Sequence, residues 1–590
     1  MELSRHTDPQ VAVALEPEVL GARTMRVRRE FFLLGFALVL AIAAFNLTYR
    51  LDREFVSEWD EALYATTASE TIAGGHWVAT TLDGAIDYYN TKPPLNFWLV
   101  AVSFKLFGPG LVSLRLVSVI SAWLTVAVMM LWTRRALGTT VAIWTGLVLS
   151  TTFGFVHVHA GRSGNTDALF TLVLVLIAVA LWAERRNIWH RAWLGPLLAT
   201  AFMLRGMAVL MPLALIAGVW IATPRAARAR FADAWRPIVC AALLAIAPVT
   251  AWMVARYQID GWAFLKLLFW YDFVERSTQV IEGHPGGVFY YLNILQKHQF
   301  DWLIAGMASA LLFPWARAEM HALWSRWRRD DLARVLVVWA VVALVLPTAM
   351  QTKLPWYLNT FYPLFALLVA LAVTHAIART RATSPDWRRY ALAASVLVAV
   401  GIAQTKLLSY SFQYRDLRLS DQGLMLSHAD QLKGHRLYRD VFDRSGAFVA
   451  RQIIGIETIY APDTAGFVRV AEGGDFLLTK QALDDPALEL VSAGGGFNLY
   501  RRGEAIARQD DVPADTPALP SAVEGVREKP QLPESAPAAP AASPSSSRSP
   551  SGSQGRDEND RSSTVRSTRL HPPPHWARRP GMILNQRPVR

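Results

Sequence analysis

Two carboxylates follow directly after the first apolar run of the sequence, and a lysine follows them by about thirty residues. Asp60 and Glu61 belong to the segment EWDEALYA, which follows that run, and Lys92 stands before two prolines in KPPLNFW. A charged side chain beside a bilayer is costly unless it is paired or solvated, so such residues are candidates for function. A carboxylate can take a proton from a hydroxyl group, and a cation can stabilise a phosphate that carries negative charge in the transition state. These residue types therefore suit group transfer from a phosphate.

Further polar residues fall in loops that the distribution of basic residues places on the same side of a membrane. Each has an ordinary interpretation when taken alone, such as a helix cap, a snorkelling side chain or an exposed turn. Together they describe an outward-facing cavity with carboxylates, cations and an imidazole, which suits chemistry on an anionic lipid-linked group. The set comprises Asp60, Glu61, Lys92, Asp167, Arg205, Glu282, His284 and Lys353.

The composition indicates which elements position these residues. The 590 residues are 53% hydrophobic and 18% charged. The apolar residues lie in runs of roughly 18 to 22, the length that spans the hydrocarbon core. We predict a polytopic α-helical membrane protein with about 11 spans and a range of roughly 11 to 13. The predicted spans are residues 31–50, 111–132, 139–158, 166–183, two short spans within 193–223, 236–255, 301–316, 333–350, 357–378 and 390–408.

The sequence divides into four segments. Residues 1–30 are polar and end in basic residues, which predicts a cytoplasmic N-terminal segment before a retained first span. Residues 31–410 form the membrane domain, in which the segment 93–107 is expected to be a helix lying in the interface. Residues 411–503 contain short mixed stretches that predict a small soluble α/β or α+β domain in the periplasm. Residues 504–590 are rich in Pro, Ser, Ala and Arg and are predicted to be disordered.

Several classes of function are disfavoured. The net charge of +12 is explained by basic cytoplasmic loops, and no basic patch with interleaved aromatics points to nucleic acid. The single cysteine, Cys240, lies in an apolar run and provides neither an intrachain disulfide nor a thiolate metal cluster. The sequence shows no glycine-rich nucleotide loop, so a nucleotide-sugar or ATP site is not supported.

The sequence resembles the membrane glycosyltransferases of the GT-C fold, in particular the aminoarabinose transferases that act on lipid A and the related protein O-mannosyltransferases. The resemblance covers residues 31–410. It implies a polyprenyl-phosphate sugar donor, a lipid or protein acceptor, and an active site at the periplasmic face of the bacterial inner (plasma) membrane. The motifs that carry it are EWDEALYA, KPPLNFW, GRSGNTDALF, MLRGMAVL, EGHPGGVFYY and KLPWYLNTFYP.

The resemblance also implies roles for individual residues. Asp60 matches the catalytic carboxylate or general base for the acceptor hydroxyl, Glu61 completes the acidic pair, and Asp167 matches a second-loop acid. Lys92 matches the lysine that contacts the donor phosphate, and Arg205 or Lys353 can assist there. Aromatic residues that line the lipid-phosphate site in members of the family correspond to Tyr64, Tyr89 and Tyr357.

The sequence departs from the family at two motifs. Arg205 stands where many members have the lysine of a KGP-like motif, whose proline is replaced by Met207. Thr91 stands where aminoarabinose transferases have a glutamate that can hold a metal together with a loop histidine. His284 and Glu282 are the candidate ligands of a divalent metal in this chain, and no other cofactor is expected.

Two other classes of function compete with a transferase. A transporter or flippase of a lipid-linked sugar also needs polar groups near its spans, but it would place several of them at mid-membrane, often in broken helices. Only the Arg205–Gly206 break resembles such an interruption. A non-catalytic assembly subunit would not need both the acids and the lysine.

We expect residues 411–503 to lie in the periplasm, because an odd number of spans carries the chain across from a cytoplasmic N-terminal segment. A reporter that is active only in the periplasm should therefore be active when it is fused after Arg502. Activity no higher than that of a cytoplasmic control fusion would overturn the topology and separate half of the proposed site from the rest.

Overall fold

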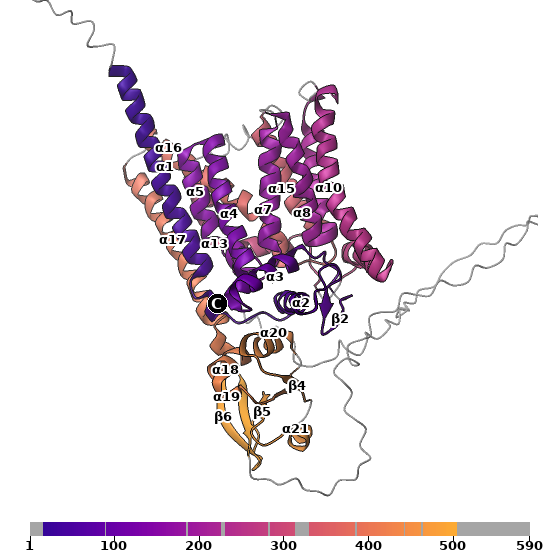
Figure 1. Ribbon diagram of the computed structural model, residues 1–590. Coiled ribbons are helices and arrows are strands. Elements are labelled where there is room, and N and C mark those ends of the chain that lie inside the picture. Colours follow the sequence, from indigo (N-terminus) through magenta and orange to yellow (C-terminus); the bar gives the residue numbers. More distant parts are fainter. Residues whose placement is uncertain are drawn as a thin grey trace, which may run out of the picture. The chain divides into compact units, whose positions relative to one another are not determined.

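The computed structural model describes residues 16–88, 90–184, 187–225, 231–280, 284–312, 330–383, 386–441, 443–461 and 464–503. Contacts divide the chain into one unit of Met1–Val523 and another of Glu524–Arg590, and all the described residues belong to the first. This part is mostly helical, and its long helices run side by side in a bundle (Figure 1). The segment 504–590 and residues 1–15 lie outside the described residues.

Six helical stretches of the described chain are long and apolar enough to cross a membrane. Four shorter apolar helices accompany them, namely Leu95–Phe107, Thr139–Ser150, Asp167–Ala183 and Tyr362–Ala378. The predicted multi-pass helical architecture is thus confirmed, whereas the number of about eleven spans stays a prediction. The six stretches are Arg29–Arg53, Leu111–Leu137, Ile188–Ala222, Asp233–Asp260, Asp331–Ala349 and Tyr390–Tyr414.

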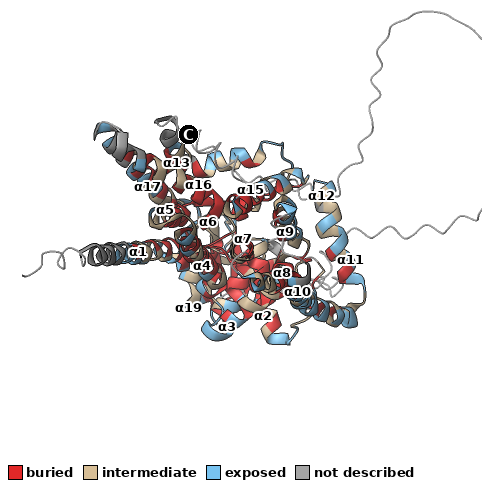
Figure 2. Cartoon of the chain, turned by 90° about the horizontal axis from the view of Figure 1, so that it is seen from above, coloured by how far each residue is buried: buried red, intermediate tan, exposed pale blue. Residues whose placement is uncertain are grey.

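Buried residues gather toward the middle of this bundle, around α7 (Figure 2). The helices of the bundle are α1 (Glu16–Thr48), α4 (Leu111–Leu137), α5 (Thr139–Ser150), α6 (Phe153–His157), α7 (Asp167–Ala183), α8 (Leu194–Arg205), α9 (Leu210–Ala222), α10 (Phe231–Asp260), α13 (Tyr290–Leu312), α15 (Asp331–Ala349), α16 (Tyr362–Thr383) and α17 (Asp386–Tyr414). Short helices α11 (Ala263–Phe269), η5 (Trp270–Glu275) and α12 (Arg276–Thr278) connect α10 to the segment before α13.

Three predicted boundaries are wrong. The helix predicted over 139–158 ends at Ser150, and a separate short helix, α6, follows after a break at Thr151 and Thr152. Helix α13 begins at Tyr290, inside a predicted loop, and is kinked where Gln299 leaves helical geometry. Helix α17 continues to Tyr414, beyond the end predicted for the last span at about residue 408.

Smaller elements cover the end of the bundle at which α1 ends and α4 and α7 begin (Figure 1). Helix α2 (Asp60–Gly74) carries Asp60 and Glu61 in its first turn, where the helix dipole favours negative charge. The hairpin of β1 (Thr81–Leu82) and β2 (Ala85–Ile86) follows, and then α3 (Leu95–Phe107) starts after two prolines. The helix expected over 93–107 is therefore present.

The C-terminal part contains a five-stranded sheet with the order β4-β3-β5-β7-β6. Strand β3 pairs in parallel with β4 and β5, whereas β7 is antiparallel to β5 and β6. The strands are β3 (Leu437–Arg439), β4 (Thr458–Tyr460), β5 (Phe476–Thr479), β6 (Leu488–Gly494) and β7 (Phe497–Arg502). The helices of this part are α18 (Asp421–Ser427), α19 (Ala429–Leu432), α20 (Arg444–Phe448) and α21 (Thr464–Val470), with the π-helix η8 (Val449–Ile454) after α20.

One hydrophobic core joins this sheet to α2 and α3. Phe476 and Leu499 of the sheet belong to the same buried cluster as Ala65 of α2. Phe104 of α3 and Phe448 of α20 stack with their ring centroids 5.9 Å apart. This shared core packs α2 and α3 against the C-terminal part.

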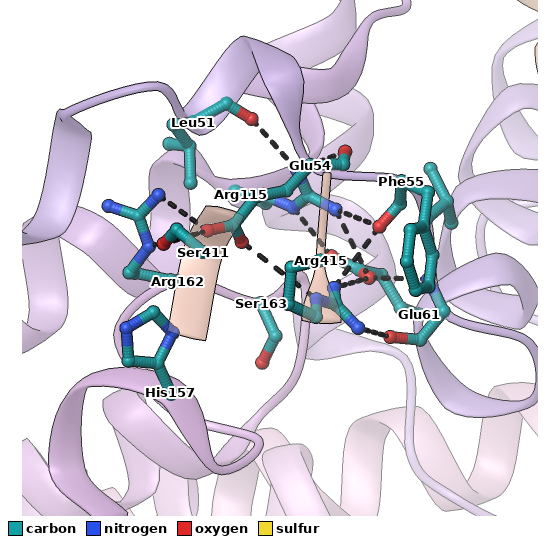
Figure 3. Close-up of polar contacts among 12 residues, drawn as sticks. Leu51, Glu54, Phe55, Glu61, Arg115, His157, Arg162, Ser163, Ser411 and Arg415 are labelled. Carbon is teal, nitrogen blue, oxygen red and sulfur yellow. Dashed lines mark hydrogen bonds and ion pairs between the residues drawn. The ribbon is translucent and has the colours of Figure 1, made fainter. Parts of the chain in front are cut away.

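A network of buried ion pairs lies at the same end of the bundle (Figure 3). The Arg115 Nε atom of α4 donates to Glu61 Oε1 over 2.8 Å, and both side chains are 0% exposed. The remaining nitrogens of Arg115 donate to the backbone carbonyls of Leu51, Glu54 and Phe55. Every donor direction of this guanidinium is therefore used, which a charge in this position requires.

The other members of the network tie three distant segments together (Figure 3). Arg162, in the loop before α7, pairs with Glu54 over 2.6 Å. Ser411 near the end of α17 donates to the same carboxylate over 2.7 Å. Arg415 follows α17 and donates to Phe55 O over 3.1 Å and to Glu61 Oε2 over 3.4 Å.

Removing Arg115 should destabilise the protein strongly, because the Glu61 carboxylate would remain buried without its main partner. We expect Arg115→Met to lower the free energy of unfolding by about 3–5 kcal/mol, measured by thermal unfolding of the purified protein in detergent. The double variant Arg115→Met/Glu61→Met should recover part of this loss, because an apolar pair carries no unpaired charge.

Arg135→Met is the matched control, since Arg135 lies exposed near the opposite end of α4. It should leave the unfolding temperature near that of the wild type. A wild-type unfolding temperature for Arg115→Met would show that the network does not hold this end of the bundle.

Candidate active site

Asp60 and Lys92 form an ion pair that remains partly open to solvent. Lys92 Nζ lies 3.0 Å from Asp60 Oδ1, and the two side chains are 20% and 33% exposed. Burial by itself would raise the pKa of the Asp60 carboxyl, but its ion pair with Lys92 and the positive charge of Arg205 outweigh burial and lower this pKa to about 2. The pKa of Lys92 is raised, because the Asp60 charge outweighs the effect of burial. Both groups are therefore charged at neutral pH.

A second acid–base pair belongs to the same cluster. Asp167 is the first residue of α7, and Arg205, the last residue of α8, donates from Nη1 to Asp167 Oδ1. The guanidinium of Arg205 lies 5.7 Å from the ring centroid of Phe170 and 6.0 Å from that of Tyr357. Because Arg205 also acts electrostatically on Asp60, the two pairs share one site.

The chain turns sharply directly after Arg205. Gly206 has φ of 53°, which side-chain-bearing residues rarely adopt, and a Cβ atom there would lie 2.7 Å from Leu268 of α11. The same Cβ would be 3.6 Å from Pro93, which follows Lys92. Its backbone conformation and the close approach of Leu268 therefore require glycine at this position, which lies beside Pro93. This accounts for the Arg–Gly break that interrupts the apolar stretch 193–223.

His159 belongs to the cluster, although the sequence did not point to it. Its ring stacks on Trp356 with the centroids 3.7 Å apart, and Asn165 Nδ2 lies 2.9 Å from its Nδ1 atom. Since an amide nitrogen donates, Nδ1 accepts in this arrangement and the proton is assigned to Nε2. Burial lowers the pKa of His159 against the opposing effects of Asp60 and Asp167. A neutral imidazole thus lies among two carboxylates and two cations.

Aromatic residues line this cluster. Lys92 Nζ lies 5.2 Å from the ring centroid of Tyr64, which packs against Phe97. Burial raises the pKa of Tyr64 to about 12, so its hydroxyl stays protonated. Tyr357 lies in η6 (Pro355–Thr360), and Asn359 of the same turn donates from Nδ2 to Val158 O over 2.9 Å. The KLPWYLN motif therefore positions both the ring of Tyr357 and the loop that carries the histidine.

The remaining candidates lie elsewhere or outside the described residues. Glu61 is directed into the network of Arg115, away from Lys92. Lys353 is buried, donates from Nζ to Thr348 O over 2.8 Å, and donates from its backbone nitrogen to the carbonyl of His284 over 3.0 Å. Tyr89 and Glu282 lie outside the described residues.

The metal prediction stays untested. Within the described ranges, no group of three or more His, Cys, Asp or Glu side chains is close enough to hold a metal ion. Thr91, which replaces the glutamate of the family, is buried next to Lys92. The described residues near His284 do not by themselves provide the ligands that a divalent metal needs.

Parts of the chain are similar in sequence to known membrane glycosyltransferases. A family model described as dolichyl-phosphate-mannose-protein mannosyltransferase matches residues 91–252. Undecaprenyl phosphate-alpha-4-amino-4-deoxy-L-arabinose arabinosyl transferase 2 of Pseudomonas fluorescens is 29% identical over 371 residues, which are 61% of this chain and 59% of the relative. The corresponding transferase of Pseudomonas savastanoi pv. phaseolicola is 30% identical over 344 residues, which are 57% of this chain and 61% of the relative. The chain thus matches less than two thirds of the length of either.

Solved structures share the fold over a longer stretch. ArnT from Cupriavidus metallidurans bound to undecaprenyl phosphate has a TM-score of 0.56 and 18% identity, over 79% of this chain and 97% of that chain. The fold of this chain is that of ArnT. The apo state of the same protein has a TM-score of 0.57 and 17% identity, over 81% of this chain and 99% of that chain. The resemblance that the motifs carry is confirmed.

Proposed function

We propose that this protein transfers a sugar from a polyprenyl-phosphate carrier to a hydroxyl group of an acceptor in the bacterial envelope, at the periplasmic face of the inner membrane. The observation that carries the proposal is the partly exposed Asp60–Lys92 pair beside the Asp167–Arg205 pair. A carboxylate that can accept a proton thus lies next to cations that can hold a phosphate. The names of the relatives, which are undecaprenyl-phosphate sugar transferases, support the same chemistry.

The reaction needs one proton acceptor and one site for the leaving phosphate. The acceptor oxygen forms a bond to C1 of the sugar, and the bond between C1 and the phosphate oxygen breaks. The acceptor proton passes to Asp60, and the carrier phosphate leaves with the bonding electrons. Lys92 and Arg205 stabilise the negative charge that persists on this phosphate in the transition state.

The strength of the Asp60–Lys92 pair suggests the order of events. A carboxylate whose pKa is about 2 is a weak base while Lys92 is its partner. A donor phosphate that binds Lys92 competes with Asp60 for the ammonium group. Since burial alone raises the pKa of this carboxyl, weakening the ion pair makes it a stronger base. Donor binding would therefore prepare the base for the acceptor proton.

The relatives are named for 4-amino-4-deoxy-L-arabinose, which makes undecaprenyl phosphate-linked aminoarabinose the first donor to test and lipid A the first acceptor. The substitution of Thr91 for the family glutamate sets this chain apart within the donor-binding motif. A transporter of lipid-linked sugars, the alternative function, would not need a base beside its cations. The two charged pairs also lie at one end of the bundle, because Asp60 and Asp167 are the first residues of α2 and α7.

Replacing Asp60 by asparagine should abolish transfer, because an amide of nearly the same shape cannot accept the proton. We expect the turnover of Asp60→Asn to fall by roughly a hundred- to ten-thousand-fold, measured as sugar transferred per folded protein in liposomes that contain the donor and the acceptor. Asp52→Asn is the matched control, because Asp52 is an exposed acid of the preceding turn. Near-normal turnover of Asp60→Asn would mean that another group takes the proton.

Removing Lys92 should change the pH dependence of the reaction. Lys92 holds the pKa of Asp60 low. Without Lys92, burial raises this pKa, so the Asp60 carboxylate becomes protonated at a higher pH than in the wild type. We expect the acid limb of kcat/KM in Lys92→Ala to move upward by roughly one to three pH units. Lys105→Ala, on the exposed side of α3, should leave the profile unchanged. An unshifted acid limb in Lys92→Ala would show that Asp60 is not the group whose protonation causes the acid limb.

A further inference from the structure

Trp59 has a backbone conformation that normally requires glycine. Its φ is 73° and its ψ is −118°, close to the first central position of a type II′ turn. A residue with a side chain is strained there, and such strain persists only where the surrounding structure enforces it. Trp59 is 57% exposed. The residue that follows is Asp60.

The C-terminal part holds the residue before Trp59. The carboxylate of Glu58 accepts hydrogen bonds from the backbone nitrogens of Arg444 over 3.0 Å and of Ser445 over 2.9 Å. Both donors lie at the start of α20, whose Phe448 stacks on α3. Two charge-assisted hydrogen bonds to backbone groups fix the carboxylate in position as well as orientation.

The segment before Glu58 is fixed by hydrogen bonds to Gln422 of α18 and to the backbone that follows α17. Gln422 of α18 accepts from Val56 N over 2.8 Å and donates to Val56 O over 2.9 Å. Phe55 N donates to Arg415 O over 3.0 Å, and Glu54 pairs with Asp416 in an antiparallel bridge. The backbone from residue 54 to residue 58 is thus bonded to the chain that leads into the C-terminal sheet.

The residue after Asp60 is held from the other side (Figure 3). Glu61 Oε2 accepts from Ser57 N over 2.8 Å, which closes the turn around Trp59. Glu61 Oε1 accepts from Arg115 and, over 2.9 Å, from Gly164 N in the loop that leads to Asp167. One carboxylate therefore links the first turn of α2 to the start of α7.

We propose that the C-terminal part and the network around Arg115 act together as a clamp that holds Trp59 in its strained conformation and so aims Asp60 at Lys92. Glu58 and Glu61 are positioning residues of this clamp, and the C-terminal sheet is a part of the active site's support. The inference rests on the proposed function for its kinetic test, whereas its test by amide exchange does not.

The first test removes the contact between Glu58 and α20. We expect Glu58→Ala to lower kcat by roughly tenfold, the effect of losing a constraint on a strained residue, while KM for the polyprenyl-phosphate donor changes by less than about twofold because Lys92 remains. Hydrogen–deuterium exchange of the peptide amides from 54 to 61 should accelerate. Glu58→Gln should recover part of kcat, since its amide oxygen still accepts from Arg444 N or Ser445 N.

The second test asks whether strain at Trp59 is the reason. Glycine adopts this conformation without strain, so Glu58→Ala/Trp59→Gly should recover most of the kcat lost in Glu58→Ala. Glu58→Ala/Trp59→Ala loses the same side chain but keeps the strain, so it should not recover. Equal recovery in both double variants, or unchanged kcat and exchange in Glu58→Ala, would overturn the proposal.

The kinetic outcome is separable from the proposed function. If the wild-type protein transfers no sugar from a polyprenyl-phosphate donor, the proposed function is wrong. The hydrogen–deuterium exchange measurement then tests the clamp by itself. Accelerated exchange of residues 54–61 in Glu58→Ala, reversed by Trp59→Gly but not by Trp59→Ala, then supports it. Exchange that stays at the wild-type rate in Glu58→Ala contradicts it.

Discussion

The buried ion pair between Glu61 and Arg115 is the contact on which the site depends. Both side chains are fully buried, so neither charge has water to stabilise it if the other is lost. Burial by itself would raise the pKa of the Glu61 carboxyl, but Arg115 and Arg415 lower it to about 2. The pair stays ionised and fixes α2 against α4. Asp60, the neighbour of Glu61, owes its place to this contact.

The two adjacent acids of EWDEALYA, Asp60 and Glu61, thus have different surroundings. Asp60 faces Lys92 and remains partly exposed, whereas Glu61 is enclosed by arginines. Adjacent residues of a helix point in different directions, so one acid can serve chemistry while the other serves structure. One helical turn therefore provides both a base that substrate can reach, Asp60, and a buried residue that fixes the turn in the protein, Glu61.

Much of the site could be predicted from the sequence. Basic loops and hydropathy placed Asp60, Lys92, Asp167 and Arg205 at one face of the membrane, and the structure gathers these residues in one cluster. This succeeded because the positions at which charges interrupt apolar runs are visible in the sequence. The helical architecture followed from the same pattern.

Other features depend on contacts between distant segments or on backbone geometry. Arg162 and Ser411 meet at Glu54 although they lie 108 and 357 positions away from it. Arg115 interrupts the apolar stretch LVSLRLVSV, a signal that could have marked it as the partner of a buried acid. The part played by His159 depends on stacking with Trp356, which its local sequence does not reveal. Lys353 was expected near the phosphate, but it donates hydrogen bonds to the backbone of Thr348 and of the His284 segment.

The central claim is that this protein adds a sugar to an envelope acceptor through the site built around Asp60. Mass spectrometry of the glycolipids and glycoproteins of the envelope tests it most directly, in cells that lack the protein and in cells that regain either the wild type or Asp60→Asn. We expect a sugar-sized mass increment on one class of envelope molecule in cells with the wild type, and no such increment in cells that lack the protein or carry Asp60→Asn. The same increment in cells that lack the protein, or in cells that carry Asp60→Asn at the wild-type level in the membrane, would contradict it.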